Sequence, residues 1–186
     1  CEQAAAKFDS MGIPVDETHP DFSGLQHVFQ TLRAAGFAAS LGPLLDTNRD
    51  DLKPEIVWNI EKGLALSGEE IIRAMTERSK IYARAAVFFE HYDLLLCPTA
   101  PNTAHRHEAE KLLVDGQETA LGPGHAANIT ATFGLTGSPA ISVPFAASRE
   151  GLPIGVQLVA PHRDEATLLG AATALEQAGV QGRPEI

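Results

Sequence analysis

Cysteine is scarce in this sequence: only Cys1 and Cys97 occur among its 186 residues. The two do not form a CxxC pair, and they are too few for a disulfide-stabilised scaffold. Small secreted domains held together by disulfides are therefore excluded. The cysteine pattern predicts a reduced protein of the cytoplasm.

Positive charge is also in short supply, since 14 lysines and arginines stand against 24 aspartates and glutamates, for a formal net charge of −10. A surface of that sign repels phosphate backbones and anionic lipids, so we expect no nucleic-acid partner and no membrane partner. The sequence has no apolar run of the ~18 residues that span a bilayer, and no secretory signal is recognised. The chain begins with Cys1 rather than methionine, which predicts a piece of a longer protein.

Hydrophobic periodicity predicts several helices. Ser67 and Glu70 form a capping-box pattern at the start of the longest one, which we expect to run to about residue 90. Ser23 and Asp164 are placed to cap two others, and Pro54 occupies a first helical position. The expected helices cover residues 1–11, 23–39, 54–64, 67–90 and 125–133, with a last one beginning at 164.

The buried positions of these helices follow from the same spacing. In the longest helix, the residues expected in the core include Met75, Ile81 and Ala85. In the last helix, Leu168 and Leu169 are expected on the buried stripe, together with Ala172 and Leu175.

Apolar segments at residues 94–97, 140–144 and 154–159 predict strands, and a shorter one is expected at 13–18. The first is apolar without interruption, as in strands covered on both faces. The second and third are joined through residues 149–151 and predict a hairpin. Residues 98–124 show no clear element. Strands mixed with helices predict an α/β fold with a mixed β-sheet covered by helices, in one domain over residues 1–186.

Candidate reactive groups are few. Cys97 ends an expected buried strand, but no base or cation is identified beside it, so we interpret it as a small buried hydrophobe. Residues 105–108 (HRHE) include metal-ligand types, yet no second cluster completes a tetrahedral set. Ser142 lies within a strand and Ser148 in a turn, and neither has the glycine-flanked presentation of a nucleophile. The residues by themselves predict no catalytic group, no metal and no cofactor.

Three motifs occur in a fixed order along the chain. They read YDLLLCPTAP at residues 92–101, LTGSPAISVP at 135–144 and GLPIGVQLVAP at 151–161, with an amphipathic helix behind them. This set resembles the C-terminal half of amidase-signature enzymes, where YDxLLxPTxP precedes LTGxPAxSVP and GLPxGxQLxxP. Two positions depart from the family pattern: Gly134 stands where members often have asparagine, and Cys97 where threonine is common. The resemblance covers most of the chain and implies the C-terminal part of the amidase-signature fold.

The resemblance implies an amidase that hydrolyses a carboxylic amide C–N bond with a Ser–cis-Ser–Lys triad and a glycine-rich oxyanion loop. Those groups precede the matched segments in the family, so we expect no catalytic residue here and no activity of the chain alone. The implied partners are a small-molecule amide and the missing N-terminal half, and exposed apolar strands would allow a homo-oligomer. Thr130, Thr132 and Phe133 are implied to bind substrate on the acyl side of the cleft.

Two alternatives stay open. The chain could belong to a transamidase subunit that acts on aminoacyl-tRNA together with partner subunits, although its acidic charge argues mildly against tRNA contact. It could also be a non-catalytic binding or scaffold domain that kept the fold. The sequence that precedes Cys1 in the gene, and whether it holds a lysine and a Gly/Ser loop, would separate these readings.

Overall fold

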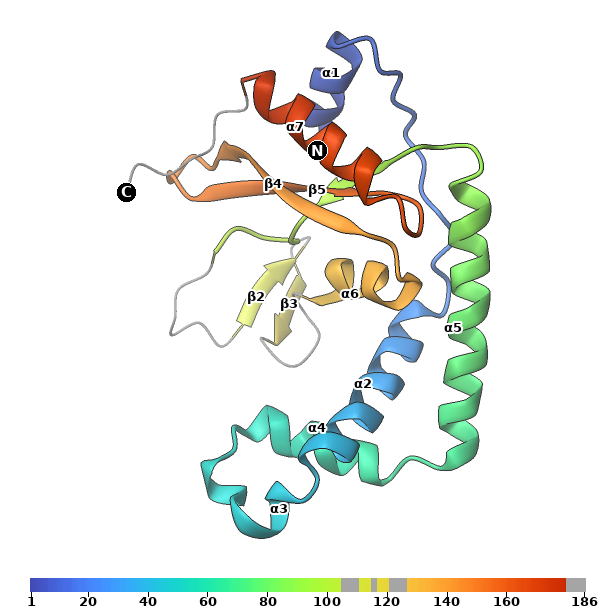
Figure 1. Ribbon diagram of the computed structural model, residues 1–186. Coiled ribbons are helices and arrows are strands. Elements are labelled where there is room, and N and C mark those ends of the chain that lie inside the picture. The colour runs from blue at the N-terminus through green and yellow to red at the C-terminus, as the bar shows by residue number, and fades with distance from the viewer. Residues whose placement is uncertain (105–110, 115–116, 121–126, 180–186) are drawn as a thin grey trace.

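The computed structural model describes residues 1–104, 111–114, 117–120 and 127–179. Helices α1 and α7 cover one side of a small sheet, α6 lies on the other, and α2, α4 and α5 extend away from it (Figure 1). Helices surrounding a sheet are what the sequence predicts. The elements are α1 (Glu2–Ser10), α2 (Leu25–Leu41), α3 (Leu44–Thr47), η1 (Arg49–Asp51), α4 (Pro54–Leu64), α5 (Gly68–Phe88), β1 (Leu95–Pro98), β2 (Lys111–Val114), β3 (Gln117–Ala120), α6 (Ala127–Thr136), β4 (Ala140–Ala147), β5 (Pro153–Val159) and α7 (Glu165–Gln177).

The main sheet has the strand order β1-β5-β4, with β5 in the centre. Both pairs are antiparallel: Leu96 is opposite Leu158 on one side of β5, and Ile141 is opposite Leu158 on the other. The expected hairpin between β4 and β5 is confirmed, and its turn is closed by a 2.7 Å hydrogen bond from the Ser148 N–H to the Leu152 carbonyl. All strand pairs in the described residues are antiparallel.

The central strand contributes to a different core on each face, because successive side chains of a strand point in opposite directions. Leu158 packs with Leu168 and Leu175 of α7 and with Phe8 of α1. Its neighbour Val159 packs on the opposite face in a second cluster. The second half of β5, residues 156–159, is therefore buried on both faces, and three of its four residues are apolar.

Capping residues and a proline in the sequence predicted the starts of helices α4, α5 and α7 correctly. The Glu70 N–H donates to the Ser67 hydroxyl at 3.2 Å, and the Ser67 N–H donates to the Glu70 carboxylate at 2.8 Å, so the capping box is present. Asp164 caps α7 by accepting from the Thr167 N–H at 3.2 Å. Pro54 is the first residue of α4. The two caps, at Ser67 and at Asp164, join residues that are only three positions apart, which is why the sequence alone predicts them.

Two expectations in the N-terminal region are wrong. Residues 13–18 form no strand, and Ile13 and Val15 are exposed, so their alternation reflects no buried sheet face. Helix α2 begins after Gly24, which has φ of 84°, and Ser23 does not cap it. The Ser23 N–H instead donates to the Asp21 carboxylate at 2.8 Å.

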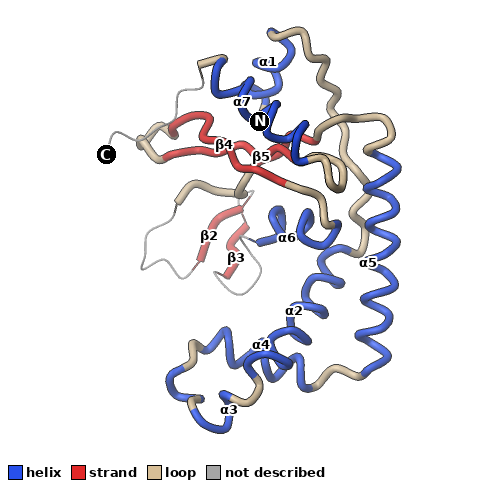
Figure 2. Tube along the Cα trace, viewed as in Figure 1, coloured by secondary structure: helices blue, strands red, loops and turns tan. Residues whose placement is uncertain are grey.

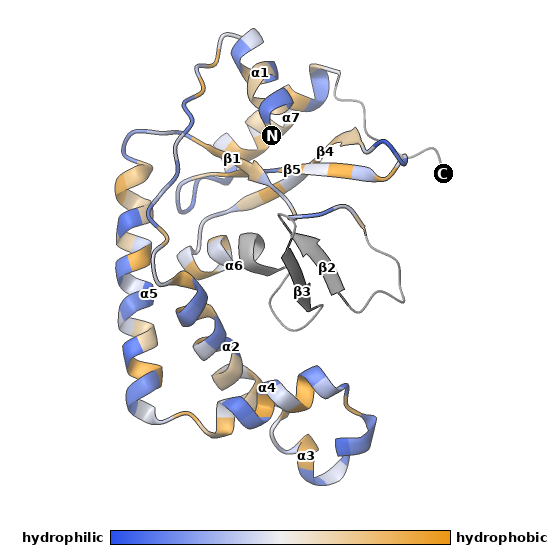
Figure 3. Cartoon of the chain, turned by 180° about the vertical axis from the view of Figure 1, so that it is seen from behind, coloured by the Kyte–Doolittle hydropathy of each residue, from blue (hydrophilic) through white to orange (hydrophobic). Residues whose placement is uncertain are grey.

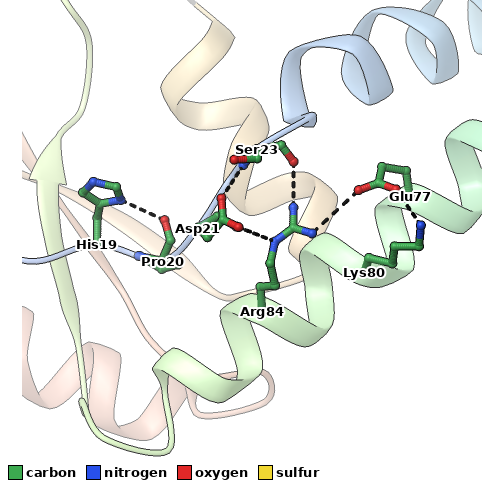
Figure 4. Close-up of polar contacts among 7 residues, drawn as sticks. All are labelled: His19, Pro20, Asp21, Ser23, Glu77, Lys80 and Arg84. Atoms are coloured by element: carbon green, nitrogen blue, oxygen red, sulfur yellow. Dashed lines mark hydrogen bonds and ion pairs between the residues drawn. The ribbon is translucent and has the colours of Figure 1, made fainter.

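A contact from α5 explains the displaced cap. The Arg84 guanidinium donates to the Asp21 carbonyl at 2.9 Å and to the Ser23 carbonyl at 2.6 Å, and it pairs with the carboxylates of Asp21 and Glu77 (Figure 4). This long-range clamp fixes the backbone of residues 21–23 before the helix starts. Sequence spacing could not predict it, because Arg84 is 61 residues from Ser23.

Three smaller differences concern extent and exposure. Residues 98–124 contain the hairpin β2–β3, which the sequence analysis did not predict (Figure 2). Helix α6 continues to Thr136, beyond the expected end at residue 133. Met75 and Leu169, both expected in the core, are 54% and 58% exposed. Among the helices of the described residues, none is long and apolar enough to span a membrane.

Candidate functional site

Helix α6 lies against the face of the sheet that looks away from α1 and α7 (Figure 1). Its Phe133 is 5% exposed and packs with Leu95 of β1 and Val159 of β5. The Phe133 ring also meets Phe22 edge-on, with the ring centroids 6.1 Å apart. Phe133 therefore anchors α6 on the sheet.

The three substrate-binding residues expected from the sequence all belong to α6. Thr132 and Phe133 are buried within this chain, so their side chains are packed rather than presented to solvent. The side chain of Thr130 lies outside the described part of the structure. Thr136, which the sequence analysis did not select, donates from its hydroxyl to the Phe133 carbonyl at 3.1 Å. A role of α6 in a substrate wall stays a prediction, and Thr130 is the residue on which it depends.

A row of polar and sulfur-bearing side chains crosses the same face of the sheet. In the strand register, Gln157 of β5 is opposite Cys97 of β1 on one side and Ser142 of β4 on the other. Directly opposed residues on neighbouring strands project to the same face, so these side chains form one row. Val159 lies on that face too, which places the row beside the apolar cluster under α6.

The hydroxyls of Thr99 and Ser142 meet next to this row, over the central strand. The hydroxyl oxygens of Thr99 and Ser142 are 2.8 Å apart and share a hydrogen bond, although the residues are 43 positions apart in sequence. They lie over Gly155 of β5: a Cβ at this glycine would be 2.8 Å from the Ser142 hydroxyl and 3.0 Å from that of Thr99. Glycine at position 155 is what lets the two hydroxyls approach the central strand.

Thr99 and Gly155 were missed by the sequence analysis, which judged Ser142 only as a possible nucleophile. Each lies within one of the three motifs, Thr99 in the first and Gly155 in the third. Their places within the motifs were therefore the sequence signal that could have identified these two residues. Sequence spacing does not show that the three segments meet on one face of the sheet.

Gln157 is the most buried polar member of the row, at 5% exposure. Its side-chain oxygen is buried and has no hydrogen-bond partner among the described residues. A buried amide oxygen without a donor costs roughly 1–3 kcal/mol, which a fold tolerates only rarely. The Gln157 row is therefore the best candidate on this face for a polar contact with a group from outside the described chain.

Cys97 has the wrong electrostatics for a nucleophile. Burial raises the pKa of the Cys97 thiol to about 11, because desolvation disfavours the thiolate. At neutral pH the thiol stays protonated, and the thiol form is a poor nucleophile. This supports the interpretation of Cys97 as a small apolar residue of the sheet.

The remaining candidates supply no reactive centre. The Ser148 hydroxyl accepts hydrogen bonds at 3.2 Å from the N–H groups of Glu150 and Leu152, so it organises the β4–β5 turn. Residues 105–108, the histidine-rich run, lie outside the described residues. Within the part of the chain that the structure describes, no group of three or more histidine, cysteine, aspartate or glutamate side chains could hold a metal ion.

Comparison with known sequences identifies the family of this chain. The family model described as Amidase matches residues 25–169. A glutamyl-tRNA(Gln) amidotransferase subunit of Clostridium acetobutylicum is 39% identical over 176 residues, which is 92% of this chain and 32% of that protein. The corresponding glutamyl-tRNA(Gln) amidotransferase subunit of Parvibaculum lavamentivorans is 32% identical over 180 residues, covering 96% of this chain and 32% of that protein.

Solved structures of amidase-signature enzymes have a fold similar to that of this chain. A crystal structure of an amidase matches with a TM-score of 0.87 at 22% identity, covering 95% of this chain and 40% of that one. The structure of 6-aminohexanoate cyclic dimer hydrolase matches with a TM-score of 0.81 at 25% identity, covering 99% of this chain and 42% of that one. The chain thus spans about a third of the length of its curated relatives. With the family model matching most of its residues, the chain belongs to the amidase-signature family.

Proposed function

We propose that this chain is the C-terminal part of an amidase, in which it completes the sheet and lines the substrate cleft while the reacting groups lie elsewhere. The family match over residues 25–169 is the observation that carries the proposal. In the full enzyme, meaning a polypeptide in which an N-terminal half with the Ser–cis-Ser–Lys triad precedes this chain, a carboxylic amide C–N bond is cleaved. The nucleophilic serine attacks the carbonyl carbon while the lysine takes its proton through the bridging serine. That proton then passes to the departing amine as the C–N bond breaks, and water releases the carboxylic acid from the acyl-serine.

Three features of the chain agree with a supporting role. The Cys97 thiol is held protonated, Ser142 shares its hydrogen bond with a threonine rather than a base, and Ser148 is engaged by its own turn. No cofactor or metal is required for this chemistry. The cytoplasmic location stays a proposal that rests on the cysteine pattern.

A transamidase subunit is the second candidate function, and the curated relatives are consistent with it. The two relatives described above are subunits of glutamyl-tRNA(Gln) amidotransferases, and the chain is 39% identical to one and 32% identical to the other. The two functions differ in substrate. Simple aliphatic and aromatic amides should be cleaved by an amidase, whereas a transamidase subunit should act on aminoacyl-tRNA and depend on partner subunits.

The substrate wall can be tested at Thr130. A wall residue acts on binding, so Thr130→Leu in the full enzyme should shift the preference between short and long acyl groups. The expected discrimination is ~1–3 kcal/mol, as for a pocket altered by one or a few carbons. The measurement is kcat/KM for a series of amides that differ only in acyl length, on the variant and the parent enzyme.

Thr136→Val is the matched control for that experiment, because Thr136 belongs to the same helix but is 3% exposed and bonded to its own backbone. It should lower stability without changing the order of substrates. A uniform fall of kcat/KM with Thr130→Leu, equal for every acyl length, would remove Thr130 from the substrate wall.

Cys97 gives an independent check on the assignment of chemistry. Cys97→Ser in the full enzyme should keep kcat/KM within about tenfold of the parent value, because a thiol that remains protonated does no covalent work. Some stability should be lost, since the new hydroxyl must find a partner in a half-buried site. A fall beyond about a hundredfold with the fold retained, measured by circular dichroism, would make Cys97 a catalytic residue.

A further inference from the structure

The face of the sheet that α6 contacts is covered at one end only. Helix α6 packs on this face around Val159, where the side chains are buried. Along β4 the same face is open, because Ala140, Ser142 and Pro144 are all exposed and side chains two positions apart share a face. None of the three is charged, and β4 shows mainly apolar and near-neutral colours in Figure 3. A sheet face that is exposed to water normally carries polar side chains, so this composition indicates a face that another part of the protein covers.

Gln157 lies in the centre of this face and lacks a hydrogen-bond donor. It is 5% exposed, and its side-chain oxygen is buried without a partner among the described residues. Its neighbours across the strands, Cys97 and Ser142, donate no hydrogen bond to this oxygen. A buried amide oxygen is normally paired, so the donor is expected from outside the described chain.

The Thr99–Ser142 pair leaves one hydroxyl hydrogen unused. In a hydrogen bond between two hydroxyls, one group donates and the other accepts, so the accepting hydroxyl keeps its own hydrogen for a further acceptor. Their mutual bond of 2.8 Å is the only hydrogen bond that either hydroxyl makes within the described residues. Gly155 lets the pair lie close to the central strand. This face therefore presents one free donor, at the hydroxyl pair, next to one free acceptor, at Gln157.

A free donor beside a free acceptor is complementary to one residue of an extended backbone. The N–H and the C=O of such a residue point to the same side of the chain, as they do in the hydrogen-bonded pairs of an antiparallel ladder. Ser142 is directly opposite Gln157, and directly opposed side chains have Cβ atoms about 4.5–5.5 Å apart. Neither group is charged, which argues against an ion as the ligand. The carboxamide of a small molecule carries the same two groups and is the competing ligand.

Burial and chain length favour a polypeptide over a small amide. The Gln157 side chain lies on the central strand next to the apolar cluster of Val159, rather than at an edge of the sheet. The chain covers 40% of the amidase structure and 42% of 6-aminohexanoate cyclic dimer hydrolase, so more than half of each of those proteins lies outside the matched fold. Each of them therefore has ample polypeptide to cover the exposed face of β4.

We propose that the Gln157 row binds an extended backbone segment of the N-terminal half. One residue of that segment donates its N–H to the Gln157 side-chain oxygen, and its carbonyl accepts from the free hydroxyl of the Thr99–Ser142 pair. The inference rests on the proposed function for the identity of the partner. It adds that specific hydrogen bonds at this row join the two halves.

Gln157→Met, made both in the isolated chain and in the full enzyme, tests the proposal by thermal unfolding. Methionine is a flexible side chain of similar length without an amide. In the isolated chain, the substitution removes a buried acceptor that has no partner, so Tm should rise by roughly 2–10 °C. In the full enzyme, it leaves the N–H of the bound segment without an acceptor. Its Tm should fall by roughly 1–3 °C, since a longer chain shifts less for the same free energy.

Thr136→Val is the matched control for the opposite signs of these two shifts. Thr136 is buried, and its hydroxyl donates to the Phe133 carbonyl within this chain. Its replacement removes a bond that both proteins contain, so Tm should fall in the isolated chain and in the full enzyme alike.

Every combination of shifts other than a rise in the isolated chain with a fall in the full enzyme overturns the proposal. A fall of Tm in both proteins would mean that Gln157 is already paired in the isolated chain, by water or by another part of it. A rise in both, together with higher KM values for simple amides, would make a small-molecule carboxamide the ligand. Opposite shifts in a full-length protein that cleaves no amide would contradict the proposed function alone, whereas amide cleavage without opposite shifts would contradict this inference alone.

Discussion

Gly63→Ala is expected to lower the free energy of unfolding of this chain by about 3 kcal/mol, at the upper end of what overpacking costs. Gly63 lies in α4 at its crossing with α2. A Cβ at this position would be 2.0 Å from the Ala34 carbonyl oxygen and 2.7 Å from the Ala38 methyl. The first of these is a backbone atom, which cannot rotate away, so the two helices must separate. Fully buried Val28 and Ile60 lie in the same helix pair.

Thermal unfolding followed by circular dichroism measures the effect, with an expected fall of roughly 6–12 °C in Tm for a chain of this size. Gly36→Ala is the matched control. Gly36 is an exposed glycine within α2, and a Cβ there would meet nothing within 4 Å. Alanine should stabilise the helix at that position by about 0.5–1 kcal/mol. An equal change for both variants would show that helix propensity, and not the close approach of α2 and α4, governs Gly63.

The contact at Gly63 also shows what the sequence could not predict. A glycine in the middle of a helix pattern is unfavourable in isolation, and only the partner helix explains why it is there. The same holds for Thr99, Ser142 and Gly155, whose meeting depends on the register of three strands. Local patterns such as the Ser67–Glu70 capping box were predicted correctly because all their atoms lie within one helical turn.

Hydrophobic periodicity predicted the helices well but not all of their buried faces. In α7, Leu168 is 4% exposed while Leu169 is 58% exposed, because the sheet covers only one stripe of that helix. Met75 of α5 fits a helical period but lies on the outer face, away from the core residue Ile81. Apolar periodicity shows that a face is to be covered, and does not show whether its own chain covers it.

The candidate site was predictable only at the level of the family. The three motifs identified the amidase-signature family, whereas the polar row around Gln157 required the strand register. The wrong prediction of a helix cap at Ser23 also has a long-range cause, because Arg84 of a distant helix donates a hydrogen bond to the Ser23 carbonyl. Long-range hydrogen bonds decide such details, and one sequence does not encode them in its local spacing.

Amide hydrolysis by the isolated chain, compared with the full enzyme, tests the central claim most directly. The chain alone should show no turnover of aliphatic or aromatic amides above the uncatalysed rate, because the proposed function assigns the nucleophile, the base and the oxyanion loop to the other half. The full enzyme should cleave at least one of these amides, with a kcat/KM typical of enzymes, on the order of 10⁴ M⁻¹s⁻¹ or more. Turnover by the isolated chain that survives repeated purification and disappears with Ser142→Ala or Cys97→Ser would contradict the account.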